Sequence, residues 1–500
     1  MAHPLGRRIT DVLRLAPDSP AIQFDGRWWS WRDVGDHADR IAAIIGDRGG
    51  KGLQVGVLLR NSPAHVATLL GIMLAGATLV VINPERGEGR TRADVSALAL
   101  PIVVGTADDT ATLIDRLDTT TVVTIAALGQ QPTATPSAAT SFGTVRDSSR
   151  HGVAVRMLTS GTTGPPKRID LTYDMLAHSV LGGDPGSTAP PTEPRHGVAI
   201  VNAPLVHIGG VFRVLQCVTE ARPFVLLPRF ELSSWIEAVR AYRPKAVSLV
   251  PAALRTVLHS NLTRDDLAGV RAVTSGTAPL SADDADAFTE KFGVPVLTSY
   301  AATEFGGGVA GWTLVDHQRY WKTKRGSVGR ASLGARLRVV DDNGMARAPG
   351  ETGLLEVKPG QMGPETDWIR TTDEAYLDAD GFLWILGRAD QAIIRGGFKV
   401  MPDDVRTALE GHPAVRGAAV VGRPDQRLGE TPVAMVELRQ AVTIQDLVAY
   451  LRDRLAPYEI PTDIALVDAL PRTPSGKPDL SEVKRHFAGA VATSRGGHAR

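Results

Sequence analysis

Short runs of apolar, β-branched residues alternate with helical patterns along the first two-thirds of this 500-residue chain, and this alternation constrains its fold most. Leu53–Leu59 and Thr78–Ile82 lie on either side of a helical segment that begins at Pro63. Ala246–Val250 and Val294–Thr298 are further runs of the same kind. Strands that alternate with helices favour parallel sheets covered by helices. The sequence therefore predicts an α/β fold with layered, mostly parallel sheets.

A different pattern follows near residue 340. Leu337–Val340 and Gly353–Val357 are separated by the turn-rich segment Asp341-Asp342-Asn343-Gly344. Two apolar runs joined through such a turn are typical of antiparallel strands. We therefore expect a small antiparallel, barrel-like part within the α/β region.

After residue 390 the pattern restarts on a smaller scale. Pro402–Glu410 is helical, Thr443–Leu455 is a helix with a capping box at Asp446, and Asp463–Val467 is a strand. Together they form an α+β unit of about a hundred residues, which is the size of a domain. We predict a large N-terminal domain at residues 1–389 and a small C-terminal domain at residues 390–500.

The composition limits the classes of partner. Lysine and arginine total 55 against 54 aspartates and glutamates, and this balance gives no sign of a nucleic-acid partner. The single cysteine, Cys217, excludes an intrachain disulfide framework and is expected to be a buried, inert thiol. Val66–Ile82 is about long enough to span a membrane, but Gly71 and Gly76 interrupt it, so it reads as a buried helix followed by a strand. We expect a cytoplasmic monomer or homodimer with no membrane span.

Residues 159–167 read Thr-Ser-Gly-Thr-Thr-Gly-Pro-Pro-Lys and suit an anion. Glycines allow the backbone to approach closely, and hydroxyls and a lysine donate to phosphate oxygens. An ordinary polar turn is the alternative, since turns use the same residues. The segment is not a Walker loop, because no Gly-Lys-Ser/Thr follows at the required spacing. The donors of such a loop are Thr159, Ser160, Gly161, Thr162, Thr163, Gly164 and Lys167.

Further motifs follow in a fixed succession. They are Pro204–Gly210, Ser275–Leu280, Tyr300–Glu304, Arg370–Asp373, Gly387–Asp390, Ile394–Pro402 and Pro471–Lys477. With the 159–167 loop, the series resembles the adenylate-forming superfamily, which includes acyl-CoA synthetases, peptide-synthetase adenylation domains and beetle luciferases. The resemblance extends from about residue 20 to about residue 485. It implies ATP, Mg²⁺ and coenzyme A, and a small domain that moves about a hinge at Asp390.

The resemblance also implies roles for single residues. The 159–167 loop would hold the β- and γ-phosphates, Thr303 would donate to the α-phosphate, and Glu304 would bind Mg²⁺. Asp373 and Arg388 would hold the ribose. Lys477 would be the catalytic cation between the carboxylate and the α-phosphate. Tyr300 would offer an aromatic face to the adenine, with the backbone of Gly276, Thr277 and Ala278 as the opposite wall. Ser275, Ala301 and Ala302 would belong to the same nucleotide site.

The acyl and CoA sites are implied in the same way. Relatives carry a histidine at the position of His207 that lines or gates the acyl pocket, although a structural histidine is the alternative. Small residues there would leave a roomy pocket for a bulky, cyclic or medium-to-long acid, with glycine turns as the other interpretation: Gly209, Gly210, Gly306, Gly307 and Gly308. Gly396, Gly397 and Lys399 would leave room for the pantetheine thiol, unless they form a plain hairpin turn.

Some residues depart from the family's usual pattern. Thr372 and Ala301 stand where glycines are common, Arg168 replaces a glycine after Lys167, and Tyr173 replaces a histidine. None of these removes a charged catalytic group, so we expect an active enzyme.

The leading hypothesis is an acid:CoA ligase that works through an acyl-adenylate. Loading of a separate carrier protein and a catalytically silent binding protein are the alternatives. A peptide-synthetase domain is disfavoured, because the segment His207–Cys217 carries no acid to hold an α-ammonium group.

Overall fold

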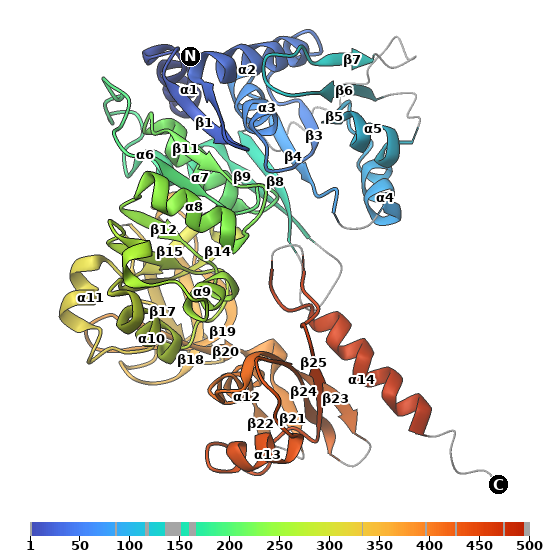
Figure 1. Cartoon of the computed structure of the whole chain (residues 1–500), viewed down its shortest axis with the longest axis vertical. Coiled ribbons are helices and arrows are strands. Elements are labelled where there is room, and N and C mark those ends of the chain that lie inside the picture. Colours follow the sequence, from blue (N-terminus) through green and yellow to red (C-terminus); the bar gives the residue numbers. More distant parts are fainter. Residues whose placement is uncertain are drawn as a thin grey trace.

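The computed structural model describes residues 3–85, 88–115, 120–135, 152–159, 167–332, 334–395, 398–425, 428–473 and 476–494. Two lobes are visible, a large one that includes the strands up to β20 (Leu383–Arg388) and a small one near the C-terminus (Figure 1). This arrangement confirms the predicted α/β class with a large N-terminal and a small C-terminal domain. A boundary at residue 390 stays a prediction.

A seven-stranded sheet forms the first layer of the large lobe. Its order is β7 (Thr133–Thr135), β6 (Thr121–Ile125), β5 (Ile102–Thr106), β3 (Gln54–Leu58), β4 (Thr78–Ile82), β8 (Val153–Thr159) and β9 (Lys167–Thr172). The five central strands pair in parallel, and both edge strands are antiparallel. The helices of this region are α1 (Pro4–Leu15), α2 (Trp31–Gly46), α3 (Pro63–Leu74), α4 (Glu88–Leu98), α5 (Ala107–Leu113) and α6 (Tyr173–Leu181).

Two further sheets continue the α/β pattern. One has the order β10 (Ala199–Val201), β11 (Phe224–Leu226), β1 (Pro20–Phe24) and β2 (Arg27–Ser30). The other has the order β12 (Ala246–Ser248), β13 (Ala272–Ser275), β14 (Val296–Ala302), β15 (Gly307–Gly311) and β16 (Arg330–Ala331). Their helices are α7 (Ile208–Thr219), α8 (Leu232–Tyr242), α9 (Pro251–Leu258), α10 (Ala282–Phe292) and α11 (Leu314–Tyr320).

The antiparallel part predicted near residue 340 is a four-stranded sheet. Its strands are β17 (Arg336–Val340), β18 (Gly353–Lys358), β19 (Ile369–Leu377) and β20 (Leu383–Arg388). The small lobe holds β21 (Ile393–Arg395), β22 (Phe398–Val400), β23 (Val415–Asp425), β24 (Gly429–Leu438) and β25 (Asp463–Val467), with α12 (Pro402–Glu410), α13 (Ile444–Arg452) and α14 (Leu480–Ser494). Short 3₁₀ turns are η2 (Arg264–Leu267), η3 (Thr303–Phe305), η4 (Gly360–Met362) and η5 (Ala389–Gln391).

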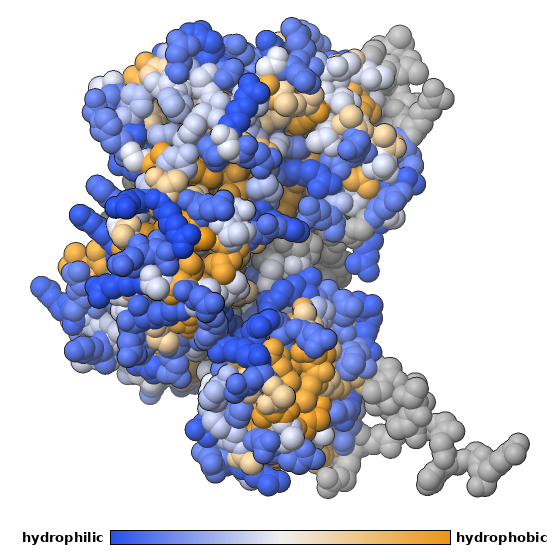
Figure 2. Space-filling model, in the orientation of Figure 1, coloured by the Kyte–Doolittle hydropathy of each residue, from blue (hydrophilic) through white to orange (hydrophobic). Residues whose placement is uncertain are grey.

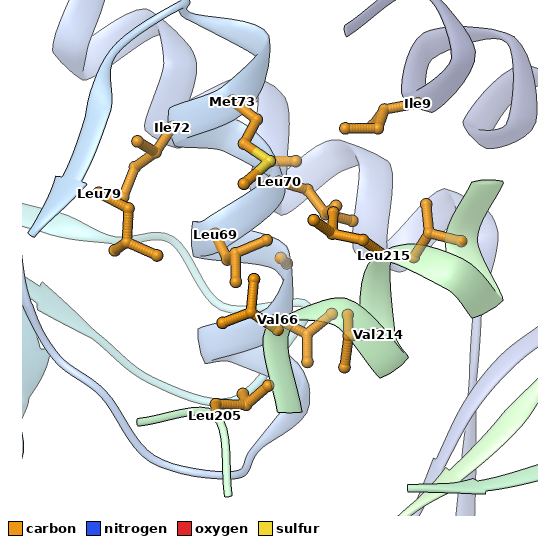
Figure 3. Packing of buried hydrophobic residues seen from close by; sticks show 14 of the residues in the cluster. Ile9, Val66, Leu69, Leu70, Ile72, Met73, Leu79, Leu205, Val214 and Leu215 are labelled. Carbon is orange, nitrogen blue, oxygen red and sulfur yellow. The ribbon is translucent and has the colours of Figure 1, made fainter. Parts of the chain in front are cut away.

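The core of the large lobe explains the most apolar stretch of the sequence. Leu70 and Met73 of α3 project toward Ile9 of α1 and Leu215 of α7 (Figure 3). A Cβ on Gly71 would lie 2.4 Å from the Ala38 carbonyl oxygen, so this glycine lets α2 and α3 pack closely. In the part of the chain that the structure describes, no helix is long and apolar enough to cross a membrane.

Cys217 lies inside this core, as its apolar neighbours in the sequence predict. Its thiol is 1% exposed and unbonded to other cysteines. Burial raises the pKa of the thiol to about 11, so the reactive thiolate is rare at neutral pH. The thiol is therefore inert, as expected.

Candidate functional site

The two residues predicted to hold a ribose lie opposite each other on neighbouring strands. Asp373 of β19 and Arg388 of β20 are direct partners in the antiparallel register. Tyr300, on β14 of another sheet, donates a short hydrogen bond from its hydroxyl to Asp373 Oδ2. One carboxylate therefore adjoins both an aromatic ring and a guanidinium, which are groups suited to a base and to its sugar.

Burial and neighbouring charges set the protonation of Asp373 and Tyr300. Burial raises the pKa of Asp373, while the hydrogen bond from Tyr300 and the charge of Arg388 oppose that rise. Burial and the neighbouring carboxylate raise the pKa of Tyr300 well above its ordinary value. The phenol therefore keeps its proton and remains a donor.

The Arg388 guanidinium is fixed by hydrogen bonds to Thr372 and Asp390. Its Nη2 donates to Thr372 Oγ1 at 2.6 Å, and its Nε and Nη2 donate to the Asp390 carboxylate at 2.9 and 2.7 Å. Thr372, one of the departures from the family pattern, thus supplies an acceptor that a glycine would lack. The predicted hinge residue Asp390 is tied directly to the predicted ribose clamp.

The segment after β13 packs tightly against β14, the strand that carries Tyr300. A Cβ on Gly276 would lie 2.8 Å from Ser299 Oγ, and Thr277 has a positive φ of 70°. The Ser275 hydroxyl is buried, and no described residue hydrogen-bonds to it. Buried hydroxyls usually have partners, so an unmatched one is suited to a bound molecule. Ala278 follows in the same turn.

β14 leads through Ala301 and Ala302 directly into η3, which carries Thr303 and Glu304. The Glu304 side chain is exposed, and among the described residues no hydrogen bond or ion pair engages it. In the same part of the chain, no group of three or more His, Cys, Asp or Glu residues could hold a metal. One free carboxylate fits Mg²⁺, which commonly takes one or two protein carboxylates together with substrate phosphates.

Lys477 reaches this region from the small lobe. Its carbonyl accepts the Thr473 N–H at 2.7 Å in a turn where Gly476 has a φ of 79°. The side chain stays accessible to solvent, yet the surrounding protein lowers the pKa of Lys477. Glu304 partly opposes that shift and Arg388 adds to it, so the charges of both residues act on the ammonium. The turn therefore brings a cation from the small lobe to residues of the large one.

His207 belongs to the same group. It precedes α7 as the N-cap residue, and its side chain makes no cap hydrogen bond. Its Nε2 is buried without a partner among the described residues. Burial, followed by the charge of Lys477, lowers the pKa of His207 to about 4. The imidazole is therefore neutral at pH 7 and has a free ring nitrogen.

The predicted pocket glycines are of two kinds. Gly209 has open space where a Cβ would be, and Gly308 has only the Tyr300 carbonyl at 4.0 Å. A Cβ on Gly210 would lie 2.2 Å from the Pro204 carbonyl oxygen, and one on Gly306 would lie 2.4 Å from Met175 Cε. Packing at Gly210 and a positive φ of 70° at Gly306 account for these two glycines, and whether either of them lines an acid pocket stays a prediction.

Two side chains next to Gly307, Gln361 and Phe212, were not predicted from the sequence. A Cβ there would lie 3.4 Å from Gln361 Nε2 and 3.6 Å from Phe212 Cζ. Gln361 is fixed by donating to the Phe305 carbonyl at 2.7 Å. Phe212 stands three positions after Gly209 on α7, so helical periodicity could have found it. No sequence signal points to Gln361.

Two predicted loops lie outside the described residues. Of the 159–167 loop, only the backbones of Thr159 and Lys167 are described, as paired ends of β8 and β9. The remaining predicted phosphate donors fall outside: Ser160, Gly161, Thr162, Thr163 and Gly164. Gly396 and Gly397 also fall outside, between β21 and β22, where the backbone of Lys399 pairs with Ile394.

Two of the remaining departures have structural roles. Arg168 Nη2 donates to Asp94 Oδ1 at 3.0 Å, which links β9 to α4. The Tyr173 hydroxyl donates to the Ala77 carbonyl at 2.7 Å inside the core. Neither side chain adds a group to the candidate site.

Comparison with known proteins gives consistent matches. Residues 10–364 match the AMP-binding enzyme family, and residues 404–477 match the C-terminal domain of AMP-binding enzymes. Feruloyl-CoA synthase of Amycolatopsis sp is 28% identical over 95% of this chain and 97% of its own length. The 4-coumarate–CoA ligase-like 8 protein of Arabidopsis thaliana is 31% identical over 65% of this chain, and that match spans only 61% of the plant protein. The crystal structure of ATP-bound MatB from Rhodopseudomonas palustris has a TM-score of 0.80 and 26% identity, and covers 97% of this chain and 99% of the other.

Proposed function

This chain belongs to the AMP-binding enzyme family, and we propose that it is an AMP-forming acid–thiol ligase that joins a carboxylic acid to coenzyme A. ATP, Mg²⁺ and coenzyme A are its cofactors and co-substrates. The observation that supports the proposal is electrostatic: the Lys477 ammonium of the small lobe interacts with Glu304, Arg388 and His207 of the large lobe.

In the first step, a carboxylate oxygen of the acid attacks the α-phosphorus of ATP. The bond from this phosphorus to the bridging oxygen breaks, and pyrophosphate leaves, so an acyl-adenylate forms. The Lys477 ammonium stabilises the negative charge that develops between carboxylate and phosphate. Asp373 and Arg388 hold the ribose, and Thr303 donates to the α-phosphate. Mg²⁺, held by Glu304, would neutralise charge on the phosphates.

In the second step, the CoA thiolate attacks the acyl carbon and AMP leaves with the electron pair of the broken C–O bond. The lysine turn and the Gly396–Gly397 loop lie about eighty residues apart in one small domain. A rotation at Asp390 would let each of them serve its own step.

A bulky acid is the proposed substrate class. The open space beside Gly209 and Gly308 supports it, and Phe212 adds an apolar wall. Feruloyl-CoA synthase, a relative that covers almost the whole chain, is named for an aromatic acid. His207 would donate to or orient the carboxylate at the mouth of this pocket. A cytoplasmic location stays a prediction, supported by the single buried cysteine.

The experiment that tests the proposal is ATP–pyrophosphate exchange with a panel of carboxylic acids and no CoA. We expect exchange with at least one bulky or aromatic acid. Adding CoA should then yield the acyl thioester and AMP in equal amounts. A chain that binds ATP but exchanges with no acid would be a silent relative. Exchange followed by transfer only to a phosphopantetheinylated carrier protein would identify the carrier as the acceptor.

Matched glycine substitutions test the pocket. In Gly209→Val, the new side chain enters open space, so we expect a narrower range of accepted acids with unchanged ATP affinity. In Gly210→Val, the same side chain meets the Pro204 backbone, so we expect loss of stability by roughly 1–3 kcal/mol. Acid KM, ATP KM and thermal unfolding separate the two outcomes. Equal loss of acid and ATP affinity in Gly209→Val would place that glycine in the nucleotide site instead.

A further inference from the structure

A buried cluster of charges joins the two lobes. It consists of Arg255 on α9, Asp284 on α10, and Arg406 and Glu410 on α12, and we call it the interdomain charge cluster. Arg255 Nη2 and Nη1 donate to the Glu410 carboxylate at 2.8 and 3.4 Å, while Arg255 Nε donates to Asp284 Oδ2 at 2.6 Å. In Figure 1, α9 and α10 face α12 across the junction of the lobes.

Glu410 is the centre of this cluster. Its carboxylate also accepts from Arg406 Nη1 at 2.7 Å and from the Ala418 backbone N–H at 3.2 Å. The Glu410 side chain is only 7% exposed and that of Arg255 only 11%. Exposed ion pairs contribute little, but removing one partner of a buried pair leaves an uncompensated charge at considerable cost. The contact is therefore strong enough to influence how the lobes dock.

Arg439 is a second cation of the small lobe, and it interacts with Asp284 of the large lobe. Arg439 follows β24, and its Nε is buried without a partner among the described residues. Burial lowers the pKa of Arg439, and the Asp284 carboxylate across the junction partly opposes that shift. Hydrophilic residues predominate where the visible surfaces of the two lobes meet (Figure 2). Charged side chains therefore contribute to this docking.

The same docking brings Lys477 to the candidate site. The small lobe has its own cores on both faces of its sheet, so it moves as one body. Glu410 at the end of α12 and Lys477 in the later turn therefore approach the large lobe together. A rotation about Asp390 that withdraws Lys477 must also separate Glu410 from Arg255.

We propose that Arg255 and Glu410 are positioning residues whose ion pair holds Lys477 in the arrangement for acyl-adenylate formation. The inference rests on the proposed two-step function. The ion pair stabilises only the domain arrangement for acyl-adenylate formation. Losing the pair should therefore slow acyl-adenylate formation and leave thioester formation unslowed.

Two matched glutamates test this. Glu356 in the large lobe resembles Glu410: it is also 7% exposed and also pairs with two arginines, Arg338 and Arg370. Glu410→Gln should slow acyl-adenylate formation on the order of tenfold, while thioester formation from supplied acyl-adenylate stays unchanged or rises. Glu356→Gln should change both steps equally or neither. Arg255→Lys should recover part of the first step that Arg255→Met loses. Equal slowing of both steps by Glu410→Gln would overturn the proposal.

A distance measurement provides a readout that needs no activity. Spin labels on Val315→Cys in the large lobe and Ile444→Cys in the small lobe use positions that are 68% and 39% exposed, while Cys217 is buried. Glu410→Gln should broaden the distance distribution in the ligand-free protein, and Glu356→Gln should not. An unchanged distribution in Glu410→Gln would refute the positioning role of the Arg255–Glu410 ion pair even if the enzyme is active. A wild-type protein that activates no acid would refute the proposed function, while the distances would still test the cluster.

Discussion

In a Lys477→Ala variant, acyl-adenylate formation is expected to fall by on the order of 100- to 1,000-fold, the usual effect of removing one group that stabilises transition-state charge. The charges of Glu304 and Arg388 act on the Lys477 ammonium, which in turn acts on His207, and we propose that carboxylate and α-phosphate meet there. Only the first step brings these two anions together. Thioester formation from a supplied acyl-adenylate should therefore be nearly unchanged. Single-turnover assays of each half-reaction measure the two rates separately.

Lys484→Ala is the control for this variant. Lys484 is an exposed lysine on α14 of the same small lobe, so its removal should leave both steps intact. If Lys477→Ala slows both half-reactions to the same degree, the lysine is structural and its assigned role is wrong.

The second large effect is expected from Asp390→Pro. Proline fixes φ near −65° and disfavours the helical region for the preceding residue, and these restrictions would hinder a rotation at η5. Pyrophosphate exchange should persist, because the arrangement seen here already brings Lys477 to the large lobe. CoA-dependent turnover should slow by about tenfold or more, equivalent to about 1.4 kcal/mol in the barrier. Both half-reactions should be measured on one preparation.

The structure adds a control that the sequence did not suggest. Asp390 accepts two hydrogen bonds from Arg388, so the proline also removes an ion pair. Asp390→Asn weakens that pair without restricting the backbone. It should leave CoA-dependent turnover closer to wild type than the proline does. Equal slowing in both variants would assign the effect to the ion pair, and unchanged turnover in the proline variant would exclude a hinge at this position.

Local chemistry made several elements predictable. The strands Thr78–Ile82 and Asp463–Val467 and the helix Pro402–Glu410 have the bounds that the sequence indicated. The capping box between Thr443 and Asp446 is present at the start of α13. Proline, glycine and capping residues act within a few positions of themselves, so their effects can be read without knowing the fold.

Contacts between residues far apart in the chain could not be predicted from the sequence. The hydrogen bond from Tyr300 to Asp373 joins residues 73 positions apart, and Arg255 pairs with Glu410 across 155 positions. The open space beside Gly209 and the filled space beside Gly210 also look alike in a sequence. Which glycine faces a pocket depends on what packs against it.

By itself, the sequence determined the layered α/β class, the two-lobed organisation and the set of residue types that adenylation chemistry requires. The class and the two-lobed organisation follow from periodicity and turn residues, and the residue set follows from the family resemblance that short motifs carry; all of these signals are local. Only the tertiary structure decided that charges of the large lobe act on Lys477, that Thr372 accepts a hydrogen bond from Arg388, and that Arg255 pairs with Glu410 across the two lobes. Hydrogen bonds and ion pairs act over a few ångströms in space, and folding alone determines which distant residues come that close.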